Sequence, residues 1–143
     1  MRLNVQTDYA LRLLMQLAVS GDRLVTIQNV SETYHISRNH LMKVAYLLGK
    51  HGLVETVRGR SGGLRLARPA EKIMVGEVVR RMEPDFALVE CLHADGCECI
   101  IENACKLRGA LVQATAAFLD VLDRKSLADL TASNRQLAAM IGA

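Results

Sequence analysis

One segment of the chain reads Leu53-Val54-Glu55-Thr56-Val57-Arg58-Gly59-Arg60-Ser61-Gly62-Gly63-Leu64-Arg65-Leu66. Its two ends, 53–57 and 64–67, are typical of strands, and the glycines and arginines between them are typical of a flexible turn. We therefore predict a short β-hairpin whose tip carries positive charge. The glycines would let the backbone of this tip approach a ligand closely.

Two helices are expected immediately before the hairpin. Thr26 can cap a helix that reaches Tyr34, and Ser37 can cap another that ends at Gly52. The break at 35–36 is short, so the two helices form a helix-turn-helix. An earlier helix is expected after Thr7, because apolar residues then recur at helical spacing.

A helix-turn-helix followed directly by a basic hairpin is a winged-helix arrangement. A helix fits the major groove of duplex DNA, while an arm tipped with arginine reaches phosphates or the minor groove. The alternative is a small α/β domain whose exposed helix is only solvated. The candidate DNA contacts are Ser37, Arg38, Asn39, His40 and Lys43 on the helix, and Arg58, Gly59, Arg60 and Arg65 in the hairpin.

The charge of the chain is unevenly distributed. The net charge is +3, but residues 35–68 hold seven Lys/Arg against one acid, whereas residues 83–102 hold six acids and no Lys or Arg. A basic segment of this kind is what phosphate binding requires. Aromatic residues make up only 3% of the chain, which disfavours a single-strand binder that stacks bases.

No targeting segment is recognisable in the sequence. No apolar run approaches the roughly 18 residues that span a bilayer, and the first residues are not an apolar signal segment. We therefore expect a cytoplasmic protein without a membrane partner, in which thiols stay reduced.

The cysteines of the chain are confined to one short segment, and they are Cys91, Cys97, Cys99 and Cys105. Thiolates gathered on a polar loop are typical of soft metal centres such as iron–sulfur clusters. Zinc and a thiol–disulfide switch remain alternatives, although the Cys-x-x-Cys pairs of structural zinc sites are absent. No nucleotide-binding glycine motif or catalytic His/Asp arrangement is found, so we expect no enzyme.

The C-terminal part of the chain is predicted to be helical. A short helix is expected over 75–82, and a long one over 105–123 carries a heptad-like apolar seam formed by Leu107, Leu111, Ala114, Phe118 and Val121. We interpret it as a dimerisation helix; a core helix within one chain is the alternative. Ser126 and Asp129 form a capping-box pattern that opens a final helix.

The order of these motifs resembles that of a known family. Thr7-Asp8-Tyr9-Ala10-Leu11-Arg12, Ser37-Arg38-Asn39-His40, the Arg-Gly-x-x-Gly-Gly hairpin and the cysteine segment are similar to the winged-helix iron–sulfur regulators that include NsrR, IscR and RirA. The resemblance implies a mainly α fold with a small β-hairpin. It divides the chain into a winged-helix domain at 1–84, a cluster-binding loop at 85–105, and dimerisation and C-terminal helices at 106–143.

The resemblance also implies a site. It is closest to the nitric-oxide-sensing NsrR branch, in which a homodimeric repressor binds operator DNA and holds a [4Fe-4S] cluster in each subunit. The matching ligands would be Cys91, Cys99, Cys105 and, from the partner subunit, Asp8, with Cys97 as an alternative ligand. The spacing between Cys91 and Cys99 is instead similar to RirA, so an iron or redox signal and a [2Fe-2S] cluster are the alternatives.

Overall fold

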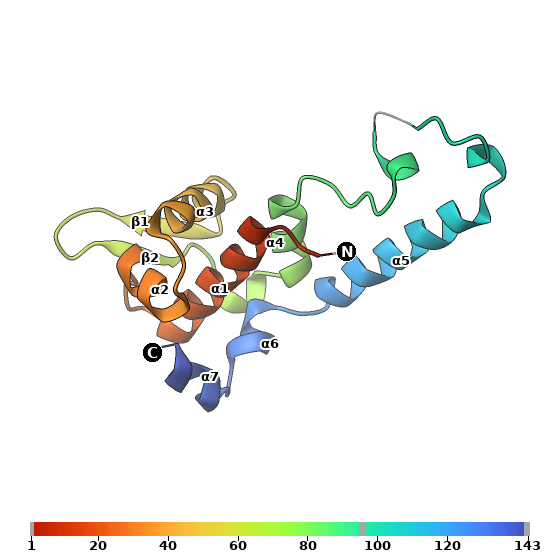
Figure 1. The fold of residues 1–143 in the computed structure, drawn as a ribbon. Coiled ribbons are helices and arrows are strands. Elements are labelled where there is room, and N and C mark those ends of the chain that lie inside the picture. Colours follow the sequence, from red (N-terminus) through yellow and green to blue (C-terminus); the bar gives the residue numbers. More distant parts are fainter. Residues whose placement is uncertain (1, 95–96, 142–143) are drawn as a thin grey trace.

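The computed structural model describes residues 2–94 and 97–141. Figure 1 shows a helical body with a hairpin projecting from one end and a long helix running to the other. The predicted fold class, mainly α with a small β-hairpin, is confirmed. The helices are α1 (Val5–Ser20), α2 (Ile27–Tyr34), α3 (Arg38–Lys50), α4 (Val75–Met82), α5 (Lys106–Asp123), α6 (Leu127–Thr131) and α7 (Arg135–Met140); the strands are β1 (Val54–Val57) and β2 (Gly63–Leu66), and the 3-10 turns are η1 (Ala70–Lys72), η2 (Glu90–Leu92) and η3 (Glu102–Ala104).

Helix α1 is the centre of the core and packs against α3, α4, α6 and β2. Its leucines Leu13, Leu14 and Leu17 are fully buried, and they share one apolar cluster with α3, the strands and Leu127 of α6. Burying each such side chain contributes about 1.5–3 kcal/mol. Residues at both ends of the chain therefore stabilise the same core.

The start of α1 corrects one prediction. The N-cap is Asn4, whose side-chain oxygen accepts a hydrogen bond of 2.9 Å from the backbone N–H of Thr7. Thr7 itself is buried in the first turn, so the prediction that it caps the helix was wrong. Asn4 is held in place from the far end of the domain, because its amide donates to the Met82 carbonyl and to the Glu83 carboxylate.

The helix-turn-helix follows the predicted local signals. Thr26 accepts a hydrogen bond from Asn29 in a complete capping box, and α2 ends at His35, which adopts a left-handed conformation. Ile36 is buried in the turn and fixes the crossing of the two helices. Ser37 occupies the N-cap position of α3, although its side chain makes no capping hydrogen bond.

The hairpin is an antiparallel pair with Glu55 opposite Arg65. The second strand is also tied to the body of the domain, because Leu64 exchanges backbone hydrogen bonds of 2.7 and 3.0 Å with Val25. A Cβ atom at Gly62 would press against the backbone of Gly59. A Cβ atom at Gly63 would press against the backbone of Val25. The glycine pair of the motif is thus required by close backbone approach.

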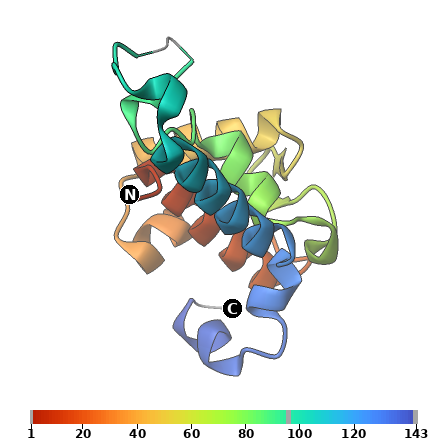
Figure 2. The ribbon, with the colours of Figure 1, turned by 90° about the vertical axis from the view of Figure 1, so that its right-hand side faces the viewer.

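Helix α5 packs against α4, and its half-buried side chains run from Leu111 to Asp123. The Arg80 guanidinium of α4 pairs with the Asp123 carboxylate, whose side chain lies against Gly76. Of the residues that the structure describes, none in α5 is buried. Figure 2 shows α5 lying across the outside of the helical body, with the cysteine segment at its upper end and α6 and α7 below.

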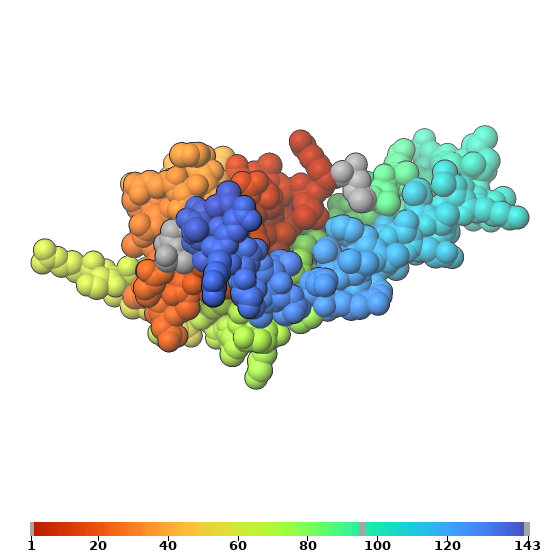
Figure 3. Space-filling model, turned by 90° about the horizontal axis from the view of Figure 1, so that it is seen from below, coloured from red at the N-terminus to blue at the C-terminus, as the bar shows by residue number. Residues whose placement is uncertain are grey.

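The C-terminal segment also differs from the prediction. The capping box of Ser126 and Asp129 is present, but it opens the short α6, and a second short helix, α7, follows after a break at Ser133 with a positive φ. The expected single final helix was therefore wrong. The space-filling view in Figure 3 shows an elongated molecule with the hairpin and the cysteine segment at opposite ends. No helix in the described part of the chain is long and apolar enough to cross a membrane.

Candidate functional site

The exposed face of α3 is the first part of the candidate site. Leu41, Val44, Ala45 and Leu48 are buried against the body and fix the orientation of the helix. The predicted contacts Ser37, Arg38, Asn39, His40 and Lys43 are all exposed. Helix α3 contains no Asp or Glu, so this face is cationic throughout its length. Such a face suits the phosphate-lined major groove.

The helix also exposes two apolar side chains that the sequence prediction left out. Met42 is 51% exposed and Tyr46 is 69% exposed. A helix advances 100° per residue, so projecting α3 from its buried residues places Asn39, Lys43 and Tyr46 at the centre of the outward face. The sequence alone could have predicted this outward face, because the apolar residues of the helix mark its buried side.

His40 occupies a different position from its neighbours. Its ring lies 6.1 Å from the ring of Tyr9 in α1, centroid to centroid. It therefore lies at the edge of α3 beside the first turns of α1. The same part of α1 carries Asp8, whose carboxylate pairs with Arg12 at 2.8 Å. The Arg12 guanidinium in turn lies 6.0 Å from the centre of the Tyr34 ring in α2.

Asp8 is thus connected through Arg12 to Tyr34 of α2, and its neighbour Tyr9 contacts His40 of α3. Burial raises the pKa of Tyr34, and the charge of Arg12 opposes that shift. The Tyr34 hydroxyl donates to the backbone carbonyl of Arg12. The Asp8 side chain is 47% exposed, so it remains reachable from outside its own subunit.

The hairpin presents its charges unequally. Arg58, Gly59 and Arg60 are exposed around the turn, as predicted for groups that contact DNA. Arg65 is also exposed, but its guanidinium pairs across the strands with Glu55 at 2.9 Å. Arg58 and Arg60 pair with no carboxylate among the described residues, whereas the charge of Arg65 is partly neutralised within the hairpin.

The cysteine segment connects α4 to α5. Its four thiols are free; Cys99 is exposed, and the other three are half-buried. Cys105 is the N-cap residue of α5. Arg108 lies 3.9 Å from Glu102 and donates to the Cys91 carbonyl, so the first turn of α5 is joined to both ends of the segment.

The thiols are near one another without forming a closed ligand set. A backbone hydrogen bond from Cys99 lowers the pKa of Cys97, but burial and the nearby Glu102, Cys91 and Cys99 together leave that pKa raised. Within residues 2–94 and 97–141, no three His, Cys, Asp or Glu side chains are grouped closely enough to hold a metal ion. Asp8 of the same chain lies in α1 and pairs with Arg12 instead.

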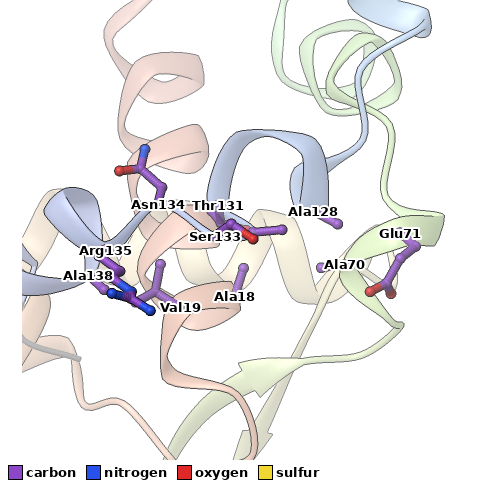
Figure 4. Close-up of a pocket in the computed structure, with 11 residues that line it drawn as sticks. Ala18, Val19, Ala70, Glu71, Ala128, Thr131, Ser133, Asn134, Arg135 and Ala138 are labelled. Atoms are coloured by element: carbon purple, nitrogen blue, oxygen red, sulfur yellow. The ribbon is translucent and has the colours of Figure 1, made fainter.

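A groove elsewhere on the molecule is separate from these surfaces. Figure 4 shows it between α1, η1 and the α6–α7 segment, with Glu71 at one end and Arg135 near the other. Many of its lining side chains are small, among them Ala18, Ala70 and Ala128. None of its lining residues was predicted to bind DNA or a metal.

Comparison with known proteins assigns the family. The family model Rrf2, described as "Iron-dependent Transcriptional regulator", matches residues 3–133. The chain belongs to the Rrf2 family. It is 49% identical over 131 residues to the HTH-type transcriptional regulator NsrR of Bacillus licheniformis, with 91% of this chain and 92% of that protein covered. Against NsrR of Bacillus subtilis the identity is 46% over 142 residues, covering 99% and 97%.

A solved structure supports the same assignment. The oxidized form of Staphylococcus aureus CymR superimposes with a TM-score of 0.74 at 26% identity, covering 92% of this chain and 97% of that chain. The resemblance inferred from the sequence motifs is therefore confirmed. The Rrf2 assignment makes this chain a transcription regulator with a winged-helix DNA-binding fold, and it implies that the protein is not an enzyme.

Proposed function

We propose that this Rrf2 regulator is a cytoplasmic, homodimeric repressor that binds operator DNA and responds to nitric oxide through an iron–sulfur cluster. The observation that carries the proposal is the cysteine segment. Its four thiols are free and at least partly exposed, they precede a helix with no fully buried residue, and the segment is joined to a basic winged helix. Thiolates are the donors that iron–sulfur clusters require, so the donor set fits such a group.

The residues that would hold the cluster are Cys91, Cys99 and Cys105, with the partner subunit's Asp8 as the fourth ligand. A cluster held partly by a carboxylate offers iron to small diatomic gases, since an oxygen ligand binds this iron less strongly than a thiolate does. The half-exposed carboxylate of Asp8 supports this role, as does the general iron dependence of the family. Clusters of the [4Fe-4S] and [2Fe-2S] types both take four protein ligands. The similarity to NsrR favours [4Fe-4S], and a [2Fe-2S] cluster is the alternative.

The contacts around Asp8 offer a route to the DNA-reading surface. In this subunit Asp8 pairs with Arg12, Arg12 lies over Tyr34 of α2, and the neighbouring Tyr9 lies beside His40 of α3. We expect a change of partner at Asp8 to shift Arg12 and the first turns of α1. Both helices of the helix-turn-helix would then move relative to the operator.

Dimerisation is supported by the uncovered surface of α5. Leu107 is 64% exposed and Val121 is 58% exposed, and both belong to the predicted seam. Burying such a seam against a second copy is the usual way to stabilise a helix of this length. Leu107→Asp should give monomers in sedimentation equilibrium, whereas Ala116→Asp should leave the dimer intact. Ala116 is exposed, and it lies nine residues from Leu107 and therefore on the opposite side of α5.

The cluster is tested by purifying the full chain without oxygen and measuring its absorbance, iron and sulfide. Matched variants separate the two adjacent thiols: Cys99→Ala should lose colour and iron, and Cys97→Ala should keep both. Colourless, iron-free protein that binds operator equally well after replacement of all four cysteines would refute the proposal.

The signal is tested by gel shift with operator fragments that the protein itself selects. Brief exposure of the holoprotein to nitric oxide should release the DNA, and unchanged affinity would reject this signal. The second candidate is an iron-availability regulator, which the seven-residue gap between Cys91 and Cys99 favours. In that case treatment with a chelator alone should change DNA affinity.

A further inference from the structure

We propose that Met42 and Tyr46 of α3 read thymine methyl groups in the major groove, and so determine part of the operator sequence. This inference rests on the proposed DNA-binding function and adds to it two residues and a chemical class of base. It starts from an exposed apolar surface that the cationic contacts predicted for α3 do not explain.

The orientation of α3 decides which side chains face outward. Leu41, Val44, Ala45 and Leu48 all point into the core, so the opposite side of the helix must face solvent. Asn39, Lys43, Tyr46 and Lys50 lie on that side, with Met42 next to them. Met42 and Tyr46 are four residues apart and are therefore neighbours on the helix surface.

These two side chains border a hollow in the surface. The hollow has a volume of about 430 Å³ and is lined by Gln6, Met42, Lys43, Tyr46 and Leu47. Most of these groups are apolar, while Lys43 and Gln6 can each donate a hydrogen bond. An apolar hollow with donors beside it can receive a methyl group while its rim contacts base edges or phosphates.

The charge of the surroundings identifies the occupant as DNA. Lys43 and Lys50 lie on the outward side of α3, Arg38 is exposed at its N-terminal end, and the helix has no acidic residue. A positively charged surface of this kind attracts the phosphates of a duplex. Within the major groove, the one apolar group that any base presents is the C5-methyl of thymine, and apolar side chains are its usual contacts.

The geometry also sets His40 apart from this role. Its ring lies beside Tyr9 of α1, at the edge of the outward face. Reading of bases is therefore assigned to the Asn39, Met42, Lys43 and Tyr46 surface. His40 is left to connect α3 with α1.

The experiment first lets the anaerobically purified full chain select duplexes from a random library. Each thymine of the selected operator is then replaced in turn by deoxyuridine, which removes only the methyl group and keeps base pairing. Loss of one buried methyl group costs about 0.8 kcal/mol, which corresponds to about a fourfold change in affinity. The wild-type protein should therefore bind about fourfold more weakly for each contacted thymine that loses its methyl group. Met42→Ala and Tyr46→Ala should each lose this discrimination at their own thymine.

Two controls accompany these variants. Tyr46→Phe keeps the ring and should retain the discrimination, and Met140→Ala removes a methionine that is 73% exposed on α7 and should behave as wild type. Because the side chains of Met42 and Tyr46 are exposed, their alanine variants should have the same melting temperature as the wild-type protein.

Three outcomes decide the matter. Loss of thymine discrimination in the two variants, with full discrimination in the controls, supports the inference. Wild-type protein that selects a sequence but binds uracil and thymine equally at every position overturns the inference alone, as does equal discrimination by wild type and both variants. Failure of the wild-type protein to select any sequence would instead reject the proposed function.

Discussion

Gly62→Ala tests how the hairpin is built. The added methyl would collide with the Val57 carbonyl oxygen and lie 2.9 Å from the Gly59 carbonyl oxygen. Both neighbours are backbone atoms, so no side-chain rotation relieves the contact. The turn must open, which breaks the 3.0 Å hydrogen bond from Gly62 N–H to the Gly59 carbonyl.

The size of the effect depends on how far the opening spreads. Loss of the turn hydrogen bond alone costs about 0.5–1.5 kcal/mol. If Leu64 shifts as well, its two backbone hydrogen bonds with Val25 are also lost, and the total reaches about 1.5–4.5 kcal/mol. For a chain of this size each kcal/mol lowers the melting temperature by about 2–4 °C.

Thermal unfolding at fixed protein concentration is the assay, and operator affinity is the second measurement. Gly49→Ala is the matched control, because its methyl would meet the Val54 carbonyl at an ordinary 3.7 Å and alanine favours a helix. We expect Gly62→Ala to melt several degrees lower and to bind DNA more weakly, while Gly49→Ala melts no lower than wild type. A Gly62→Ala protein that melts within about 1 °C of wild type and binds DNA normally would refute this account of the hairpin.

Three further perturbations have defined outcomes. Glu55→Gln should free Arg65 to contact a phosphate, so that DNA affinity rises. The slope of log affinity against log salt concentration, measured by fluorescence anisotropy, should steepen by about 0.9. An unchanged slope would show that Arg65 contacts no phosphate. Hydrogen bonds from Ser126 lower the pKa of Asp129 in the folded protein below its usual range. The ionised carboxylate therefore stabilises the fold above the usual pKa of aspartate, and this stabilisation is lost as the pH falls through the lower folded pKa. Asp129→Asn should flatten the dependence of melting temperature on pH in that acidic range, and parallel curves for variant and wild type would contradict this. Leu127→Ala should cost about 2–5 kcal/mol in denaturant unfolding, while Met140→Ala should cost little, and equal midpoints would place α6 outside the core.

Features determined by residues close in sequence were predicted well. The bounds of α4 agree with the prediction, and the capping residues Thr26 and Ser126 both accept the expected hydrogen bonds. A cap depends on residues three positions apart, so the sequence contains all the relevant chemistry. The hairpin was predictable for the same reason, since its turn and its strand pattern are contiguous.

Features determined by distant contacts were not predicted. Asn4 caps α1 because Met82 and Glu83 hold its side chain, and no local pattern reveals a contact across 78 residues. Likewise the pairing of Arg65 with Glu55 depends on hairpin register, and the contact of His40 with Tyr9 depends on how α1 crosses α3. The contacts of Arg65 and His40 each change the role expected of a predicted DNA contact.

The predicted cluster ligands depend on more than one subunit, and the reason lies in α5. This helix has 18 residues, none of which is buried. Most helical stability in proteins comes from packing of an apolar face, so burial of the exposed apolar side of α5 against another surface would increase its order. Cys105 is the N-cap of α5, and Arg108 in the first turn of the helix contacts Glu102 and the Cys91 carbonyl. Order in α5 therefore orders both ends of the cysteine segment, and we expect Leu107→Asp to weaken iron retention as well as dimerisation, although it removes no ligand.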